Sequence, residues 1–286
     1  MPATADQPSG GTGPEPAGSN LVLRVVSALV LAPVALVAAY LGGWAFFMFW
    51  LMAAIGVLWE WNGLVAKAAA WRISLASGLA LVLGSVLVLF ESAGLGLLLV
   101  LGGVAMAALS APGDRRVWAA TGVIYAAALV LSPVVLRADA TYGLAAIALL
   151  FAVVWSTDIA AYFGGRLLGG PKLWPRVSPK KTWSGALVGT AVAVAAGVAV
   201  GHAAGADNLV LLGAVCLLLS AVSQAGDLFE SAIKRRFEAK DSGQLIPGHG
   251  GLMDRLDGFV AAAFVGVLIG LSRGGWEAPS RGLMIW

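Results

Sequence analysis

The feature that most constrains the fold of this chain is the recurrence of apolar stretches long enough to cross a bilayer as helices. A membrane-spanning helix needs about 20 apolar residues. Such stretches lie at approximately 24–42, 44–63, 74–91, 93–110, 117–136, 142–163, 184–204, 208–228 and 257–272. Only 12% of the residues are charged, whereas a soluble protein carries about twice that fraction. The sequence therefore predicts an all-α polytopic membrane protein with about nine transmembrane helices.

The segments between and around these stretches divide the chain into four parts. Residues 1–20 hold four Pro and four Gly and no aromatic or branched aliphatic residue, so we expect a disordered tail. This tail lacks the pattern of a cleaved secretory signal, so we expect the first apolar helix to be retained as an anchor. Residues 21–140 form the N-terminal transmembrane helices. We expect residues 141–272 to form a C-terminal transmembrane region that holds the catalytic candidates, with cytoplasmic loops at 164–183 and 231–256, and 273–286 to form a short tail.

The Lys and Arg residues predict the orientation of the helices, because cytoplasmic loops are enriched in basic residues. With the N-terminus inside, 15 of the 18 basic residues fall on the inner face, and Arg137, Arg273 and Arg281 fall outside. We therefore expect an integral membrane protein, in the bacterial inner membrane, with an active site that faces the cytoplasm. The small excess of basic over acidic residues is explained by topology, and no nucleic-acid partner is expected. The single Cys216 excludes a disulfide framework.

Two helices carry ionisable residues near their inner ends. Helical spacing places Asp158 on one face with two aromatic residues, and it places Gln224, Asp227, Ser231 and Lys234 on one face of a later helix. A charge inside a membrane helix costs several kcal/mol unless it is paired or solvated, so each is a functional candidate. A structural ion pair with a nearby base is the alternative for Asp158 or Asp227 taken alone.

The polar run at 231–258 has the composition of a phosphate site. Gly250 and Gly251 follow His249 in a PGHGG turn, and glycines let backbone N–H groups approach phosphate oxygens. Basic residues flank the turn on both sides. Asp254 and Asp257 follow at helical spacing and supply the oxygen ligands that Mg²⁺ prefers. A basic patch that only attracts anionic lipid is the alternative, but it would need neither the glycines nor the aspartates.

Several segments together resemble the phosphatidate cytidylyltransferases, also called CDP-diacylglycerol synthases. They are DIAAYFGGR at 158–166, SPKKTW at 178–183, QAGDLFES at 224–231 and the whole run at 231–258. The resemblance covers about 155–258, and the N-terminal half is similar to the family only as a set of apolar helices. Ser184 stands where members commonly carry Glu, which argues against an essential carboxylate there.

The resemblance implies transfer of the cytidylyl group from CTP to phosphatidic acid, with Mg²⁺ as cofactor and CDP-diacylglycerol and pyrophosphate as products. It implies Asp227 and Asp254 as metal ligands, with Asp158 and Asp257 in the same acidic cluster. Lys234, Ser231 and His249 join the two aspartates as catalytic residues. A base is not required, because a lipid phosphomonoester already carries about −1.5 to −2 charges. The substrate-binding candidates are Lys180, Lys181, Gln224, Arg235, Gly250, Gly251 and Arg255.

Three questions remain open at this point. The chain could use another lipid phosphate, or it could be a transporter of anionic solutes. Glu60, at the inner end of the second helix, could pair with a cytoplasmic base or face the active site. The Gly185/Gly189 and Gly197/Gly201 steps permit close helix approach either within the chain or across a homodimer.

Overall fold

The computed structural model describes residues 17–67, 70–90, 92–243, 245 and 250–286, and this part of the chain is almost entirely helical. The long helices are α1 (Ala17–Leu41), α2 (Gly43–Ala66), α3 (Ala70–Leu89), α4 (Ala93–Ser110), α5 (Arg116–Ala138), α6 (Gly143–Leu168), α7 (Trp183–Ala203), α8 (Leu209–Arg236) and α9 (Met253–Gly274). Among the described residues, eight helices, α2 to α9, are long and apolar enough to span a membrane, and α1 adds a shorter apolar segment, Leu29–Leu41. Each predicted apolar stretch corresponds to one of these helices. The chain is an all-α polytopic membrane protein, as predicted.

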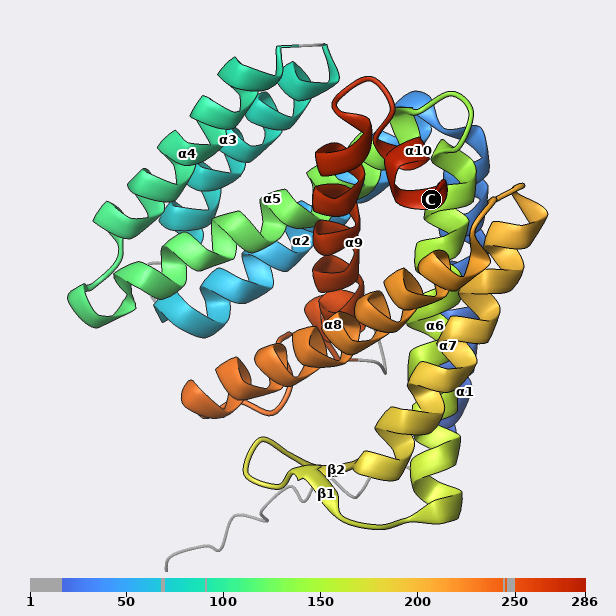
Figure 1. Cartoon of the computed structure of the whole chain (residues 1–286). Coiled ribbons are helices and arrows are strands. Elements are labelled where there is room, and N and C mark those ends of the chain that lie inside the picture. Colours follow the sequence, from blue (N-terminus) through green and yellow to red (C-terminus); the bar gives the residue numbers. More distant parts are fainter. Residues whose placement is uncertain (1–16, 68–69, 91, 244, 246–249) are drawn as a thin grey trace, which may run out of the picture.

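The helices form two antiparallel pairs on either side of a central group. In Figure 1, α3 and α4 lie on one side of the molecule, α6 and α7 lie on the other, and α9 stands between them. Aromatic rings join the centre: Trp50 of α2 stacks on Phe259 of α9 with ring centroids 4.5 Å apart, and Phe151 of α6 lies beside both. This contact links the N-terminal helices to the helix that follows the polar run.

The glycine pairs of α7, Gly185/Gly189 and Gly197/Gly201, pack against other helices of the same chain. A Cβ atom on Gly189 would lie 2.7 Å from the carbonyl oxygen of Thr157 on α6, and one on Gly185 would lie 2.6 Å from that of Ala161. Gly197 and Gly201 pack against side chains of α8. Small residues let helix backbones approach closely in a membrane, so these steps bring α6, α7 and α8 together within one molecule.

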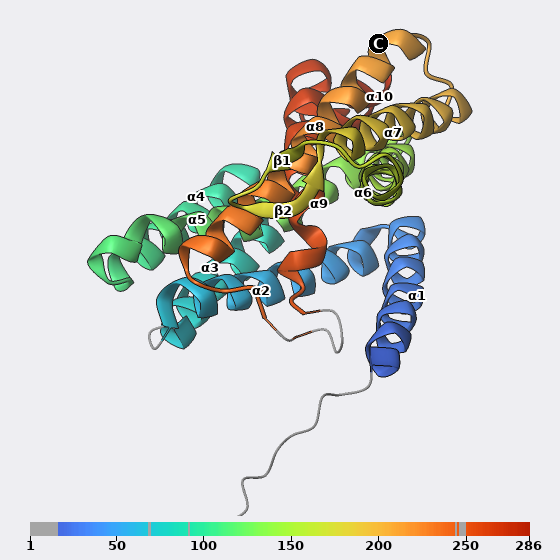
Figure 2. The same cartoon turned by 90° about the horizontal axis from the view of Figure 1, so that it is seen from below.

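A short β-hairpin occupies most of the loop between α6 and α7. Strands β1 (Lys172–Trp174) and β2 (Ser178–Thr182) pair antiparallel, with Lys172 opposite Thr182. Thr182 also caps α7, because its Oγ1 accepts a hydrogen bond from the Gly185 amide at 3.2 Å. Ser184 donates a hydrogen bond to the Gly169 carbonyl at the end of α6. The hairpin is thereby fixed at both ends, and it lies across α8 in Figure 2.

The C-terminal segment packs on the far end of the bundle, opposite the hairpin (Figure 1). The short helix α10 (Pro279–Met284) is held there by Asp139, which follows α5. Asp139 Oδ1 accepts hydrogen bonds from the amides of Thr141 and Tyr142, and Oδ2 accepts one from the Arg281 amide at 3.1 Å. This carboxylate therefore ties α5, α6 and α10 together at that end.

Candidate active site

A cavity of about 930 Å³ opens at the hairpin end of the bundle, between α6, the hairpin, α7, α8 and α9. Its charged lining is balanced. Six carboxylates line it, from Asp158, Asp227, Glu230, Asp241, Asp254 and Asp257. Six basic side chains also line it, from Arg166, Lys172, Lys180, Lys181, Lys234 and Arg255. A polar cavity of this kind at the end of an apolar bundle is the natural place for a charged substrate.

Close helix packing brings the acidic residues of α8 and α9 together. A Cβ atom on Gly226 of α8 would lie 2.7 Å from the carbonyl oxygen of Asp257 on α9. Asp227 follows Gly226 directly, and both aspartates line the cavity. Asp158 of α6 is exposed, lines the same cavity and interacts electrostatically with Asp227. The three carboxylates therefore come from three helices.

The hairpin supplies a basic residue in direct contact with this acidic group. Lys181 forms an ion pair with Asp227 Oδ2, and each side chain is 29% exposed. Lys180, next to it on β2, is exposed and lines the same cavity. Gln224, one turn before Asp227, donates a hydrogen bond to Thr190 Oγ1 on α7 at 2.9 Å. The predicted face of α8 thus contacts both the hairpin and α7.

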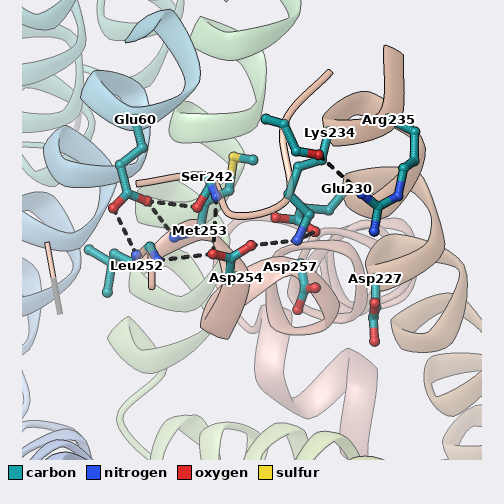
Figure 3. A network of polar contacts seen from close by, with 12 residues as sticks. Glu60, Asp227, Glu230, Lys234, Arg235, Ser242, Leu252, Met253, Asp254 and Asp257 are labelled. Carbon is teal, nitrogen blue, oxygen red and sulfur yellow. Dashed lines mark hydrogen bonds and ion pairs between the residues drawn. The ribbon is translucent and has the colours of Figure 1, made fainter. Parts of the chain in front are cut away.

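Lys234 lies between two carboxylates. Its Nζ is 2.7 Å from Glu230 Oε2 and 2.5 Å from Asp254 Oδ1. Glu230 is buried, and its Oε1 has no hydrogen-bond partner within the described residues. The Lys234 ammonium is therefore held at a fixed point of the cavity wall by one acid from its own helix and one from α9 (Figure 3).

Asp254 accepts hydrogen bonds on both carboxylate oxygens. Oδ1 accepts from Lys234, and Oδ2 accepts from the amides of Ser242 and Gly251 at 3.1 and 2.9 Å. This aspartate joins the end of α8, the segment that follows it and the start of α9. Because both oxygens already accept hydrogen bonds from protein groups, Asp254 is a weaker candidate for a metal ligand than its position in the sequence suggests.

Glu60 of α2 holds the same segment from the other side. It is 4% exposed, and its carboxylate accepts hydrogen bonds from the amides of Leu252 and Met253 and from Ser242 Oγ. It does not line the cavity. The expectation that Glu60 either pairs with a base or faces the site is therefore replaced by a third role, contact with the backbone at the start of α9 (Figure 3).

Most of the predicted site residues meet in the cavity. Those that line it are Asp158, Lys180, Lys181, Gln224, Asp227, Lys234, Asp254, Arg255 and Asp257. Ser231 is half-buried on α8 and is not part of the lining. Arg235 is exposed and donates to the Ala239 carbonyl at 3.3 Å, away from the lining.

The glycine turn is described only in part. His249 lies outside the described residues. Gly250 has a φ of +83° and Gly251 is buried, and neither lines the cavity. A Cβ atom on Gly251 would clash first with Ser242 Oγ, and it would lie 2.7 Å from Glu60 Oε2 and 2.9 Å from the Gly243 backbone nitrogen, so this glycine is required by its close packing against these three residues.

The described residues contain no group of three His, Cys, Asp or Glu side chains arranged to hold a metal ion unaided. Mg²⁺ commonly binds one or two carboxylates and completes its shell with water and substrate phosphates. Asp227, Asp158 and Asp257, which line one cavity and interact electrostatically, fit such a partial shell. Asp254 fits less well because both its oxygens already accept protein hydrogen bonds.

The chain resembles known proteins over nearly its full length. A family model described as the cytidylyltransferase family matches residues 22–271. The phosphatidate cytidylyltransferase of Brucella suis biovar 1 (strain 1330) is 44% identical over 263 residues, which cover 92% of this chain and 97% of the relative. That of Brucella abortus (strain 2308) is 45% identical over 253 residues, or 88% of this chain and 94% of the relative. The phosphatidate cytidylyltransferase of Bacillus subtilis (strain 168) is 44% identical over 120 residues, or 42% of this chain and 45% of the relative.

Proposed function

The chain belongs to the cytidylyltransferase family, and from this premise we propose that it is a phosphatidate cytidylyltransferase. It transfers the cytidylyl group of CTP to phosphatidic acid and forms CDP-diacylglycerol and pyrophosphate. The observation that carries the proposal is the cavity at one end of the helix bundle, which combines six basic with six acidic side chains. A transporter is not supported, because the family consists of nucleotidyl-transferring enzymes.

The chemistry requires positioning and charge compensation more than a strong base. The phosphate of phosphatidic acid is already an anion near neutral pH, so one of its oxygens can attack the α-phosphorus of CTP directly. A new bond forms between this oxygen and the α-phosphorus. The bond from the α-phosphorus to the oxygen bridging the α- and β-phosphates breaks, and pyrophosphate leaves with the electron pair. The protein must bring several anions together and neutralise the charge on the leaving group.

The two kinds of lysine in the cavity suit different parts of this task. Lys180 is exposed on the hairpin, and Lys181 beside it is 29% exposed and paired with Asp227; both line the cavity and can bind the phosphates of incoming CTP. Lys234 is held between Glu230 and Asp254, so it presents a positive charge at a fixed position. A preorganised charge of this kind stabilises a transition state without a cost in reorganisation. Arg255 at the start of α9 adds a further cation to the lining.

The balance of charges in the cavity supports a requirement for Mg²⁺. Six carboxylates offset six basic side chains, so the lining alone does not compensate the charge of a nucleoside triphosphate. Divalent cations bound to Asp227, with Asp158 or Asp257, would supply the missing positive charge and act as Lewis acids on the phosphates. The acidic residues then serve the reaction instead of opposing the binding of CTP.

The protein is an integral membrane protein, and we propose the bacterial inner membrane with the cavity facing the cytoplasm. The cavity opens at the end of the bundle that carries the hairpin lysines and the basic end of α8. Arg137 and Arg281 lie with Asp139 and α10 at the opposite end. This distribution supports the orientation given by the positive-inside rule. A homodimer remains a prediction. The glycine pairs of α7 that suggested one pack against helices of the same chain, so they no longer support it.

Purified protein in detergent, incubated with labelled CTP and phosphatidic acid, tests the proposed function. We expect lipid-soluble label and an equal amount of pyrophosphate, both dependent on Mg²⁺. Parallel reactions with lysophosphatidic acid and with an isoprenoid phosphate test the other lipid-phosphate alternative. The proposal is overturned if phosphatidic acid yields no product or if another lipid phosphate is used with much higher kcat/KM.

A further inference from the structure

Glu60 makes a contact whose importance is not evident from its position in the chain. It lies on α2, and the residues that it binds lie between α8 and α9 or at the start of α9. Its Oε1 accepts from the Leu252 amide at 2.9 Å, and its Oε2 accepts from the Met253 amide at 2.8 Å and from Ser242 Oγ at 3.2 Å. The two carboxylate oxygens thus bind two successive amides and a hydroxyl group (Figure 3).

These amides belong to the start of α9. The first N–H groups of a helix have no partner within the helix and are usually bound by a side chain of the preceding residue. Leu252 occupies the capping position and has no side chain that can accept a hydrogen bond. Glu60 performs the capping from a different helix, and its negative charge is favourable at a helix N-terminus.

The surroundings of Glu60 are shaped to fit this contact. A Cβ atom on Gly243 would lie 2.6 Å from Glu60 Oε1, and one on Gly251 would lie 2.7 Å from Oε2. One turn earlier on α2, a Cβ atom on Gly56 would lie 2.9 Å from the side chain of Leu252. Glycines therefore stand on both sides of the contact, and a larger residue at Gly243 or Gly251 would displace the Glu60 carboxylate from its present position.

The contact leads directly to the cavity. Asp254 follows Met253, and its Oδ2 accepts from the amide of Ser242, the same residue whose hydroxyl group binds Glu60. Its Oδ1 binds Lys234. A shift of the start of α9 would therefore move Asp254 and, with it, the Lys234 ammonium.

We propose that Glu60 is a positioning residue for the reaction: by binding the start of α9, it sets the position of Asp254 and of the Lys234 ammonium at the cavity wall. This inference rests on the proposed function of the cavity. A positioning role for Glu60 differs from a purely stabilising role in one measurable respect. A stabilising contact affects how much protein is folded, whereas a positioning contact affects kcat in the folded protein.

The variant Glu60→Gln tests the proposal with little change in size. The substituted side chain has one acceptor oxygen and one NH₂ group, so it loses the paired acceptance of both backbone amides and presents an N–H group to one of them. We expect kcat to fall about tenfold or more with little change in KM for CTP, the pattern of an interaction made in the transition state. Glu60→Asp retains two acceptor oxygens and should recover part of kcat.

Asp139→Asn is the matched control. Like Glu60, Asp139 is a buried carboxylate with three donors, here the backbone amides of Thr141, Tyr142 and Arg281, but it lies at the other end of the bundle. Its substitution should lower the melting temperature to a similar degree and leave kcat within about twofold of wild type, because it removes the same kind of contact outside the site. If Glu60→Gln does not fold, Ser242→Ala, which removes one hydrogen bond to Glu60, should show a smaller loss of kcat.

Hydrogen–deuterium exchange gives a readout that needs no substrate. In Glu60→Gln, the amides of Leu252 and Met253 should exchange about tenfold faster or more than in wild type, and in Asp139→Asn they should not. The proposal is overturned if folded Glu60→Gln keeps wild-type kcat, or if Asp139→Asn loses as much kcat as Glu60→Gln. If the wild type forms no product from CTP and phosphatidic acid, the proposed function fails, while the exchange rates still report whether Glu60 holds the start of α9.

Discussion

Lys181 on the hairpin and Asp227 on α8 form an ion pair within the cavity. The pair joins an accessible basic element of the site to a helix that carries two of its acidic side chains, Asp227 and Glu230. Each partner is 29% exposed, so water and ligands reach both. If Lys181 bound a phosphate and Asp227 bound a cation, the ion pair between the two residues would be replaced by two new ionic contacts, one for each residue.

Asp227→Asn should abolish turnover. The substitution keeps the size of the side chain but removes the charge that would bind Mg²⁺, so we expect kcat to fall by about 100-fold or more. Labelled CTP and phosphatidic acid provide the assay, with Mg²⁺ concentration varied. Asp114→Asn is the control, because Asp114 is an exposed acid outside the cavity. Near-normal Mg²⁺-dependent activity in Asp227→Asn would contradict the assignment.

Lys180→Ala should weaken the binding of CTP. Loss of one charge-assisted hydrogen bond to phosphate costs about 1.5–3 kcal/mol, so we expect KM for CTP to rise at least about tenfold. Steady-state kinetics with CTP varied at saturating lipid measure the change. Arg176→Ala removes an exposed charge of the same hairpin that does not line the cavity, and its KM should stay at the wild-type value. An equal rise of KM in both variants would indicate a general effect of hairpin charge.

Lys234→Met should be both inactive and unstable. The change leaves the buried Glu230 carboxylate without its cation, and removal of one partner of a buried pair costs about 3–5 kcal/mol. The double variant Glu230→Gln/Lys234→Met removes both charges of the Glu230–Lys234 pair and leaves Asp254 with its two backbone amide donors, so it should regain part of the melting temperature without regaining activity. Thermal unfolding in detergent, followed alongside turnover, separates the two effects. A wild-type melting temperature for Lys234→Met would show that the pair is not needed for stability.

Gly189→Ala should lower the melting temperature, because a Cβ atom there would lie 2.7 Å from the Thr157 carbonyl oxygen and force α6 and α7 apart. Overpacking of this kind costs about 1–3 kcal/mol. Gly102→Ala on α4 is the control, since a Cβ atom there meets nothing within 4 Å. Thermal unfolding of the two variants measures the difference, and equal melting temperatures would argue against close packing at Gly189.

The helices could be predicted from the sequence because each depends on a local property, the length of an apolar stretch. The stretch at 93–110 matches α4 in full. Agreement was poorer for the apolar stretches where helices continue into polar sequence: the stretch at 208–228 ends before α8, which continues to Arg236, and only the helical spacing of Gln224, Asp227, Ser231 and Lys234 indicated this continuation. An apolar criterion stops where charges begin, although Lys and Arg are good helix formers. The hairpin was not predicted, because its strands are too short for an alternating pattern to stand out.

The site could be predicted where its residues share one helix face or one short segment. Asp158, Asp227, Lys181 and Lys234 were identified in this way, and all line the cavity. Glu230 was missed, although its spacing of four residues from Lys234 is a signal that the sequence carries. The expectation that Asp254 serves mainly as a metal ligand did not include its contacts with Lys234 and with the backbone at 242 and 251, which depend on the tertiary fold.

The contact of Glu60 with the start of α9 makes the two halves of the chain interdependent. A chimera that takes its N-terminal helices from a distant relative should be active only if the donor supplies a carboxylate at the place of Glu60 and a small residue at that of Gly56. Natural sequence change at these two positions is likewise expected to be correlated with change at Gly243 and Gly251. The N-terminal helices would then be inherited together with the catalytic region instead of being exchanged as an independent module.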